Sequence, residues 1–175
     1  YAFFERGKLT SYDEIVAASV KYDSGTTVEF IADPEIFKEG TSLDVNLLRK
    51  QLQELAFLSP GLTFVLRVDS SSEEIASKNG LLDYLDYLAK EKDNLTSKFY
   101  AETSENRIGV KIALMYVDQY TDTYKLYTNS IPNVSGTHLT GFRTALTQAV
   151  NTYAREKGLL KEKEDIILNT QEKIN

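Results

Sequence analysis

The sequence predicts an α+β domain with a mixed β-sheet and helices packed mainly on one face, and it leaves an α/β arrangement open. Three observations lead to this prediction. Stretches with apolar residues every three or four positions alternate with stretches of period two. Glycine and proline residues separate several of them. The 175 residues, of which 42% are hydrophobic and 26% charged, suit one domain with a sizeable core.

Strands are expected near the N-terminus and in the middle of the chain. We expect a short strand with a turn at Gly7 in YAFFERGKL, and a second strand in TTVEFIADPEIF, where apolar and polar residues alternate until Pro34. Four more strands are expected in LTFVLRVD, KFYAET, RIGVKIALMYVD and YKLYTNS. A loop is expected in the mostly polar stretch SSSEEIASKNG.

Three stretches have the apolar period of a helix. The first begins after Asp44, whose side chain suits an N-cap, and ends at Ser59-Pro60-Gly61. The third ends before Gly158, which suits the C′ position after a helix. The residues expected to face the core are Leu48, Leu52 and Leu55 in the first helix, Leu81, Leu85 and Leu88 in the second, and Phe142, Leu146, Val150 and Tyr153 in the third.

The third helix follows the stretch NVSGTHLTGFR, which contains the only histidine of the chain, His138. A catalytic histidine needs a nucleophile and an orienting carboxylate, and no nucleophile motif is present, so a structural role is favoured. Thr137 is expected to cap the helix. Gly136 is expected to supply an unusual φ or a close backbone approach, because neither it nor Gly141 belongs to a phosphate-binding glycine motif.

Composition excludes several kinds of site. The chain has no cysteine, which excludes disulfides and thiolate ligands, and one histidine excludes a multi-histidine metal site. The net charge of −6 argues against nucleic-acid binding by the whole surface but allows one basic face. Arg143 and Arg155 lie about 120° apart around a helix, so they do not force a basic stripe. No apolar run is long enough to span a membrane, and a cytoplasmic protein is expected.

Residue patterns alone therefore indicate a scaffold or interaction domain, but four stretches resemble a known family. These are Gly25–Phe37, Leu48–Leu62, Asn79–Leu88 and Tyr127–Leu160, and they resemble the transducer domain of bacterial type II topoisomerase ATPase subunits, which are DNA gyrase B and its topoisomerase IV counterpart. The most specific part of the resemblance is a structural motif made of Gly136, Thr137, His138, Gly141 and Phe142.

The resemblance implies a fold and a domain arrangement. The fold would be an α+β sandwich related to a ribosomal small-subunit protein, with a left-handed β-α-β crossover that departs from the usual right-handed rule. Residues 1–24 would be a lead-in strand and linker from an upstream ATPase domain. Residues 25–160 would be the transducer domain, and residues 161–175 a tail.

The resemblance also implies a function. The transducer couples ATP binding and hydrolysis in a neighbouring GHKL domain to DNA strand passage and supercoiling. The chain would be part of an ATP-dependent topoisomerase and inactive alone, since it lacks the GHKL motifs. ATP and Mg²⁺ would be bound mainly outside it. Expected partners are double-stranded DNA, the DNA-cleaving subunit and a second copy through the full ATPase subunit, with no membrane.

Two groups of residues follow from the resemblance. Gln171 and Lys173 match the ends of the family's Gln-Thr-Lys loop, with Glu172 in place of threonine, and Lys173 would reach the γ-phosphate of ATP. Arg143, Arg155 and Lys157 would face the cavity through which DNA passes. The alternative is a non-enzymatic interaction module, a truncated paralogue that has lost ATP coupling. A hydrolase that uses His138 is the weakest possibility.

Overall fold

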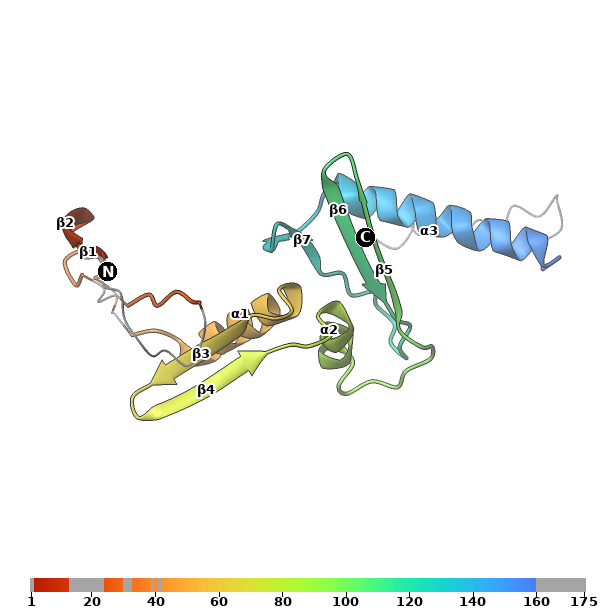
Figure 1. Cartoon of the computed structure of the whole chain (residues 1–175). Helices are drawn as coiled ribbons and strands as arrows, with labels where there is room; N and C mark the ends of the chain where they lie inside the picture. Colours follow the sequence, from red (N-terminus) through yellow and green to blue (C-terminus); the bar gives the residue numbers. More distant parts are fainter. Residues whose placement is uncertain (1, 13–23, 30–32, 39, 41, 160–175) are drawn as a thin grey trace. The chain divides into compact units, whose positions relative to one another are not determined.

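The computed structural model describes residues 2–12, 24–29, 33–38, 40 and 42–159 (Figure 1). In these residues the chain forms three helices and eight strands, so the predicted α+β class is confirmed. The chain divides into two compact units, Tyr1–Gln51 and Leu52–Asn175. None of the described helices is long and apolar enough to cross a membrane.

The first unit begins with a β-hairpin of β1 (Ala2–Glu5) and β2 (Lys8–Tyr12). Its turn residues Arg6 and Gly7 have φ angles of 49° and 76°, as a type I′ turn requires. The strand and the turn at Gly7 are confirmed, whereas β2 was not predicted. The strand expected after Thr26 is not found in residues 24–29, where no partner strand pairs with the backbone, and residues 30–32 lie outside the described part.

Helix α1 (Val45–Leu58) begins and ends where the sequence predicts. The Asp44 carboxylate accepts hydrogen bonds from the backbone N–H groups of Asn46 and Leu47, at 2.9 and 3.0 Å, which makes it the predicted N-cap. The helix stops before Gly61, whose φ of 96° is in the left-handed region.

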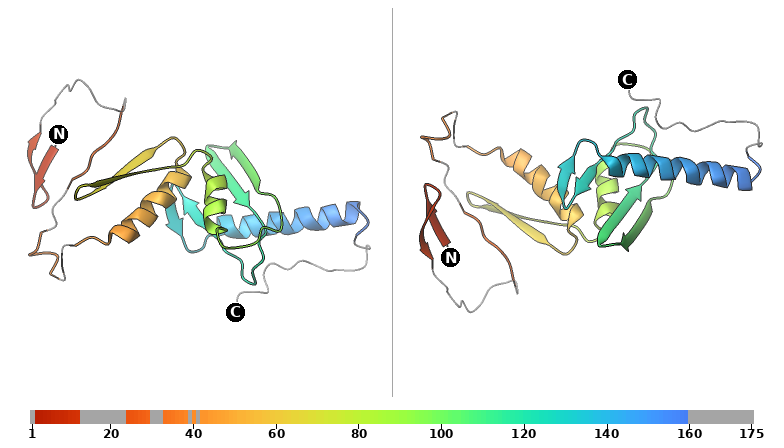
Figure 2. Two further views of the ribbon diagram at one scale, coloured as in Figure 1. Left: turned by 90° about the horizontal axis from the view of Figure 1, so that it is seen from below. Right: turned by 90° about the horizontal axis from the view of Figure 1, so that it is seen from above.

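The second unit contains three hairpins and two further helices. Its elements are β3 (Thr63–Val68), β4 (Ser71–Ala76), α2 (Leu81–Leu88), β5 (Phe99–Glu105), β6 (Ile108–Leu114), β7 (Leu126–Thr128), β8 (Ile131–Asn133) and α3 (Thr137–Glu156). The hairpins pair β3 with β4, β5 with β6 and β7 with β8. In both views of Figure 2, α2 lies beside the β5–β6 hairpin.

All strand pairs in the described residues are antiparallel and two-stranded, which differs from the predicted single mixed sheet. A mixed sheet and a left-handed β-α-β crossover both need parallel strands, and no such pair is found in the part that the structure describes. The physical reason is local: each strand is followed after a tight turn by a segment that pairs with it directly. Asn106 and Arg107, for example, have φ angles of 50° and 66° at the turn between β5 and β6.

The prediction of a loop in SSSEEIASKNG is wrong, because most of this stretch forms β4. A tight turn with Asp69 at a φ of 52° brings Ser71 opposite Val68, and the pairing continues to Ala76 opposite Thr63. Ile75 is 2% exposed and anchors the strand in the core. The polar residues of β4 remain exposed, and this composition hides the strand from pattern analysis.

The core of the second unit lies around the end of α1 and the start of α2. Its buried apolar residues are Ala56, Phe57, Leu66, Ile75, Tyr84 and Ala89. The rings of Phe57 and Tyr84 are stacked, with centroids 4.8 Å apart and an interplanar angle of 16°. Leu52 and Leu55, which were predicted to face the core, are only half-buried.

Helix α3 has one half-buried stripe and an ordered end. Phe142, Leu146 and Val150 lie on this stripe as predicted, whereas Tyr153 is 58% exposed and does not. Gly158 has a φ of 68°, and its N–H donates to the Arg155 carbonyl at 2.9 Å. The N–H of Leu159 donates to the Ala154 carbonyl at 2.8 Å, which completes a Schellman motif and confirms the predicted role of Gly158.

Candidate functional site

The start of α3 differs from the prediction in one residue. Gly136, not Thr137, is the N-cap, and no side chain caps the helix. The Gly136 carbonyl accepts hydrogen bonds from the N–H groups of Leu139 and Thr140, at 3.1 and 3.4 Å, so the helix begins with Thr137 already in its first turn. The prediction that Thr137 caps the helix is therefore wrong.

Gly136 is explained by a close approach rather than by an unusual φ. Its φ of 163° is extended backbone that any residue adopts. A Cβ atom at this position would lie 2.5 Å from Cε1 and 2.6 Å from Nδ1 of His138, so a larger residue would displace the imidazole. His138 is exposed, and within the described residues it has no hydrogen-bond or ion-pair partner that could make it a general base.

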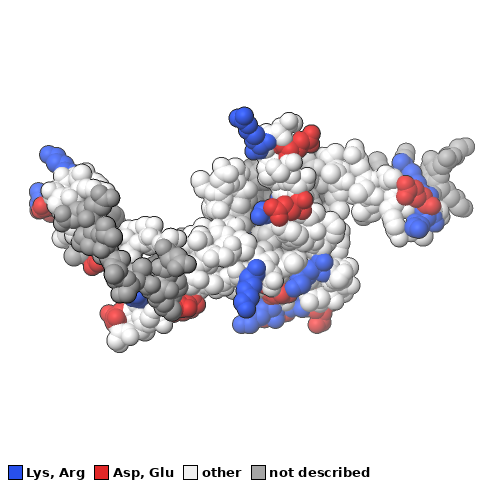
Figure 3. All heavy atoms as spheres, in the orientation of Figure 1, with Lys and Arg blue, Asp and Glu red and all other residues white. Residues whose placement is uncertain are grey.

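The three basic residues predicted to face DNA are not brought together. The guanidinium carbon of Arg143 lies 4.7 Å from the centroid of the Tyr124 ring, and its Nε is buried with no hydrogen-bond partner among the described residues. Arg155 and Lys157 lie in and just after the last turn of α3, about 18 Å farther along the axis. Figure 3 shows Lys and Arg beside Asp and Glu at that end of the helix.

The other predicted site residues divide into two groups. Phe142 lies on the half-buried stripe of α3, while Gly141 is exposed. Gln171 and Lys173 lie outside the described residues.

A polar cluster that the sequence did not reveal joins three elements of the second unit. We call Glu54, Tyr84, Lys125 and Tyr127 the Glu54 cluster. The Tyr84 hydroxyl donates to Glu54 Oε1 at 3.0 Å, and Lys125 Nζ lies 3.0 Å from the same oxygen. The Tyr127 hydroxyl donates to Glu54 Oε2 at 3.2 Å, and the two tyrosine oxygens are 2.9 Å apart.

The members of this cluster change each other's protonation. Burial raises the pKa of Glu54, but hydrogen bonds from Lys125, Tyr84 and Tyr127 outweigh it, so that the pKa lies below its usual value. The hydrogen bond to Glu54 raises the pKa of Lys125. Burial, together with the neighbouring phenol and carboxylate, strongly raises the pKa of Tyr84. At neutral pH the cluster therefore holds an ionised carboxylate, an ammonium group and two neutral phenols.

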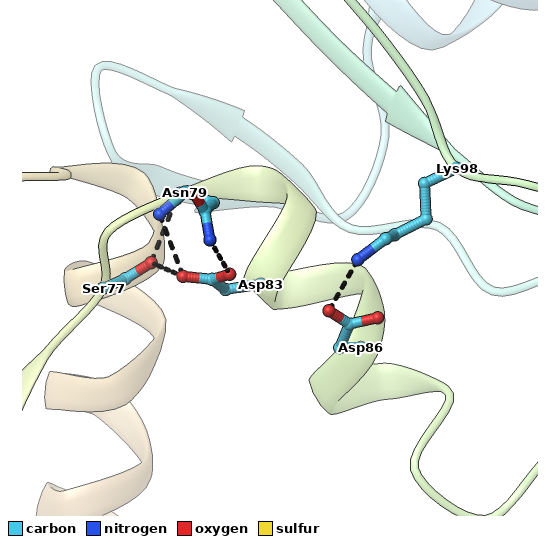
Figure 4. Close-up of polar contacts among 6 residues, drawn as sticks. Ser77, Asn79, Asp83, Asp86 and Lys98 are labelled. Carbon is cyan, nitrogen blue, oxygen red and sulfur yellow. Dashed lines mark hydrogen bonds and ion pairs between the residues drawn. The ribbon is translucent and has the colours of Figure 1, made fainter.

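A second polar cluster fixes the start of α2 (Figure 4). The Asp83 carboxylate accepts hydrogen bonds from the Ser77 hydroxyl at 2.7 Å and from the backbone and side-chain nitrogens of Asn79, both at 2.9 Å. The backbone hydrogen bond from Asn79 is the largest of the contacts that lower the pKa of Asp83 to about 2. Asp86, one turn farther on, forms an ion pair with Lys98 at 2.6 Å.

The Asp83 cluster predicts a specific acid sensitivity. Because the folded-state pKa of about 2 lies below the reference value of 3.8, the ionised carboxylate stabilises the fold above about pH 4, and this contribution is lost as the pH falls toward 2. Asp83→Asn places an amide NH₂ against a donor and should cost about 1 kcal/mol at pH 6. Urea unfolding from pH 6 to pH 2 should show this difference shrinking. Asp86→Asn is the control, with an expected cost below about 0.5 kcal/mol.

The described residues do not fit a magnesium–ATP site. Among them, no group of three or more histidine, aspartate or glutamate side chains could hold a metal ion. The Glu54 cluster has a single carboxylate, and Lys125 occupies it. What these groups do is join elements: hydrogen bonds and one ion pair hold α1, α2 and β7 together.

Comparison with known proteins identifies the family. The family model described as DNA gyrase B matches residues 80–173, which is more than half of the chain. The DNA gyrase B protein of Streptococcus pyogenes serotype M18 is 36% identical over 171 residues, which cover 94% of this chain and 26% of that protein. The B protein of DNA topoisomerase 4 from Streptococcus pneumoniae serotype 4 is 34% identical over 165 residues, which cover 93% of this chain and 25% of that protein.

A solved structure agrees with these relatives. The crystal structure of the 43K ATPase domain of Thermus thermophilus gyrase B in complex with an aminocoumarin matches with a TM-score of 0.64 and 33% sequence identity. The match covers 75% of this chain and 37% of that one. The chain spans about a quarter of the length of the curated relatives named above. By the family model, the relatives and the fold together, the chain belongs to the DNA gyrase B family of type II topoisomerases.

Proposed function

We propose that this chain is a transducer, which couples ATP binding and hydrolysis in a neighbouring ATPase domain to the passage of one DNA duplex through another. The observation that carries the proposal is the extent of the match. It covers 94% of this chain but 26% of a gyrase B protein, and 37% of a gyrase B ATPase-domain structure. A segment of that size inside an ATPase fragment suits a connecting role better than an independent enzyme.

The proposal assigns ATP contact to the end of the chain. The family model matches through residue 173, which supports a place for Gln171 and Lys173 in the family's loop. A lysine ammonium there would stabilise the negative charge that develops during phosphoryl transfer. ATP and Mg²⁺ would be held mainly by the neighbouring domain, since the described residues do not fit them.

The proposal assigns DNA contact to exposed cations of α3. Arg155 and Lys157 are exposed, and a lysine or arginine at such a position attracts a phosphate backbone without reading its bases. Arg143 would act from the other end of the helix, where Tyr124 holds its guanidinium. The proposed partners are DNA, the DNA-cleaving subunit and a second copy of the gyrase B protein, in the cytoplasm.

The proposal is tested by transplanting the chain. The matching segment of Streptococcus pyogenes gyrase B is replaced with this chain, and the chimera is combined with the DNA-cleaving subunit of the same organism. We expect ATP-dependent supercoiling from the chimera and no ATP hydrolysis from the chain alone. A folded chimera that hydrolyses ATP but never changes DNA topology would contradict the proposal and favour the non-enzymatic interaction module.

Lys173→Ala tests the proposed ATP contact in the same chimera. Removing one cation from the phosphoryl-transfer site should lower the rate of ATP hydrolysis about a hundredfold. Lys161→Ala, which removes a cation from the same tail, is the control and should leave the rate unchanged. Equal rates for the Lys173 variant and the parent chimera would remove Lys173 from the site.

A further inference from the structure

Glu54 is the point where three elements of the second unit meet. It lies in the second half of α1, and its partners lie 30, 71 and 73 residues away along the chain, in α2 and at β7. The cluster is partly buried, with 32% of the Glu54 side chain and 41% of the Lys125 side chain exposed. These are long-range polar contacts next to a stacked aromatic core.

The cluster has fewer protons than contacts between its oxygen atoms. Glu54, Tyr84 and Tyr127 make three oxygen–oxygen contacts, of 3.0, 3.2 and 2.9 Å, but an ionised carboxylate leaves only the two phenolic protons. If both hydroxyls donate to Glu54, the contact between the tyrosines has no proton. If one tyrosine donates to the other, Glu54 loses a donor. The cluster therefore has two hydrogen-bond patterns, and the position of each member depends on the others.

The β7–β8 hairpin connects this cluster to α3. Lys125 lies just before β7 and Tyr127 lies in it, and the turn at Asn129 and Ser130 leads directly into β8. The Thr128 hydroxyl donates to Asn133 Oδ1 at 2.7 Å and links the two strands of the hairpin. Only residues 134–136 separate β8 from the first turn of α3.

We propose that Glu54 is a positioning residue of the transducer, which fixes the β7–β8 hairpin, and through it the start of α3, relative to α1 and α2. This inference rests on the proposed function. A change in the position of α1 or α2 would be passed on to α3 because one carboxylate holds α1, α2 and β7. Without Glu54, the apolar contact of Phe57 with Tyr84 would still hold α1 against α2, but β7 would lose both of its bonds to α1.

The chain contains a matched control. Glu102 has the same kinds of partner as Glu54, a tyrosine and a lysine: the Tyr100 hydroxyl donates to Oε2 at 2.7 Å, and Lys111 Nζ lies 3.1 Å from Oε1. All three residues belong to the β5–β6 hairpin, so Glu102 joins no separate elements. Comparing Glu54→Gln with Glu102→Gln separates the loss of a carboxylate from the loss of a connection.

The test measures coupling rather than activity alone. The two variants are made in the gyrase B chimera, and ATP hydrolysis, supercoils introduced per ATP and thermal unfolding are measured for each. Glu54→Gln should leave the rate of ATP hydrolysis within about twofold but lower the supercoils per ATP about fivefold, which is within the range for mutations along coupling networks. Glu102→Gln should leave both unchanged. Lys125→Arg, which keeps the cation, should preserve coupling, whereas Lys125→Met should reduce it.

The outcomes separate this inference from the proposed function. A parent chimera that hydrolyses ATP without changing DNA topology ends the proposed function, and the inference with it. A working parent overturns the inference alone if Glu54→Gln keeps normal coupling, or if Glu102→Gln reduces coupling equally. Should Glu54→Gln fail to fold, Tyr127→Phe takes its place, because Tyr84 can still donate to Glu54 in that variant. It must then lower the supercoils per ATP at an unchanged unfolding temperature, and otherwise the inference is overturned.

Discussion

Replacing Phe57 with alanine is expected to lower the free energy of unfolding by about 3–5 kcal/mol. Phe57 is 6% exposed, and its ring stacks on Tyr84 and lies 5.5 Å, centroid to centroid, from Tyr87. The substitution removes apolar area from the core and leaves a cavity between α1 and α2. Because the chain has no tryptophan, urea unfolding is best followed by far-UV circular dichroism.

Phe99→Ala is the matched control for this prediction. The Phe99 side chain on β5 is 52% exposed, so its removal should cost less than about 1 kcal/mol. If both substitutions cost the same, Phe57 does not form the centre of a packed core in solution.

Ile75→Ala is expected to cost about 2–4 kcal/mol, because Ile75 is 2% exposed and its side chain is the buried anchor of β4. The same measurement decides whether this stretch is a strand or a loop, since an apolar residue in a solvated loop would lose almost nothing. Ser72→Ala, an exposed position of the same strand, should change the free energy of unfolding by no more than about 0.5 kcal/mol. A cost below about 1 kcal/mol for Ile75→Ala would contradict the paired strand.

Local signals predicted most of the helices and their ends. Asp44 and Gly158 cap their helices as expected, because each needs only backbone groups a few residues away. Thr137 was misplaced by one residue, since Gly136 and a threonine after it both suit the start of a helix. Tyr153 continues the apolar period of α3 but is exposed, because periodicity does not show where the packing surface ends.

Features that depend on tertiary contacts were not predictable from the pattern. β4 is mostly polar, and only its pairing with β3 makes it a strand. The Glu54 cluster unites residues that are far apart in sequence, and none of them forms a recognisable motif with its neighbours. Arg143 was expected beside DNA on the basis of family resemblance, while its stacking on Tyr124 required the fold.

The pairing of each strand with its neighbour in sequence has a consequence for how the chain folds. Hairpins with two-residue turns close short loops, which is fast, whereas the contacts of Glu54 with Tyr84 and Tyr127 close loops of 30 and 73 residues. We expect the hairpins to form early and the Glu54 contacts to form after the transition state. Glu54→Gln should then accelerate unfolding while leaving the folding rate nearly unchanged, which stopped-flow folding kinetics would measure. The residue proposed to connect the elements in the working protein would also be one of the last to lock them in place during folding.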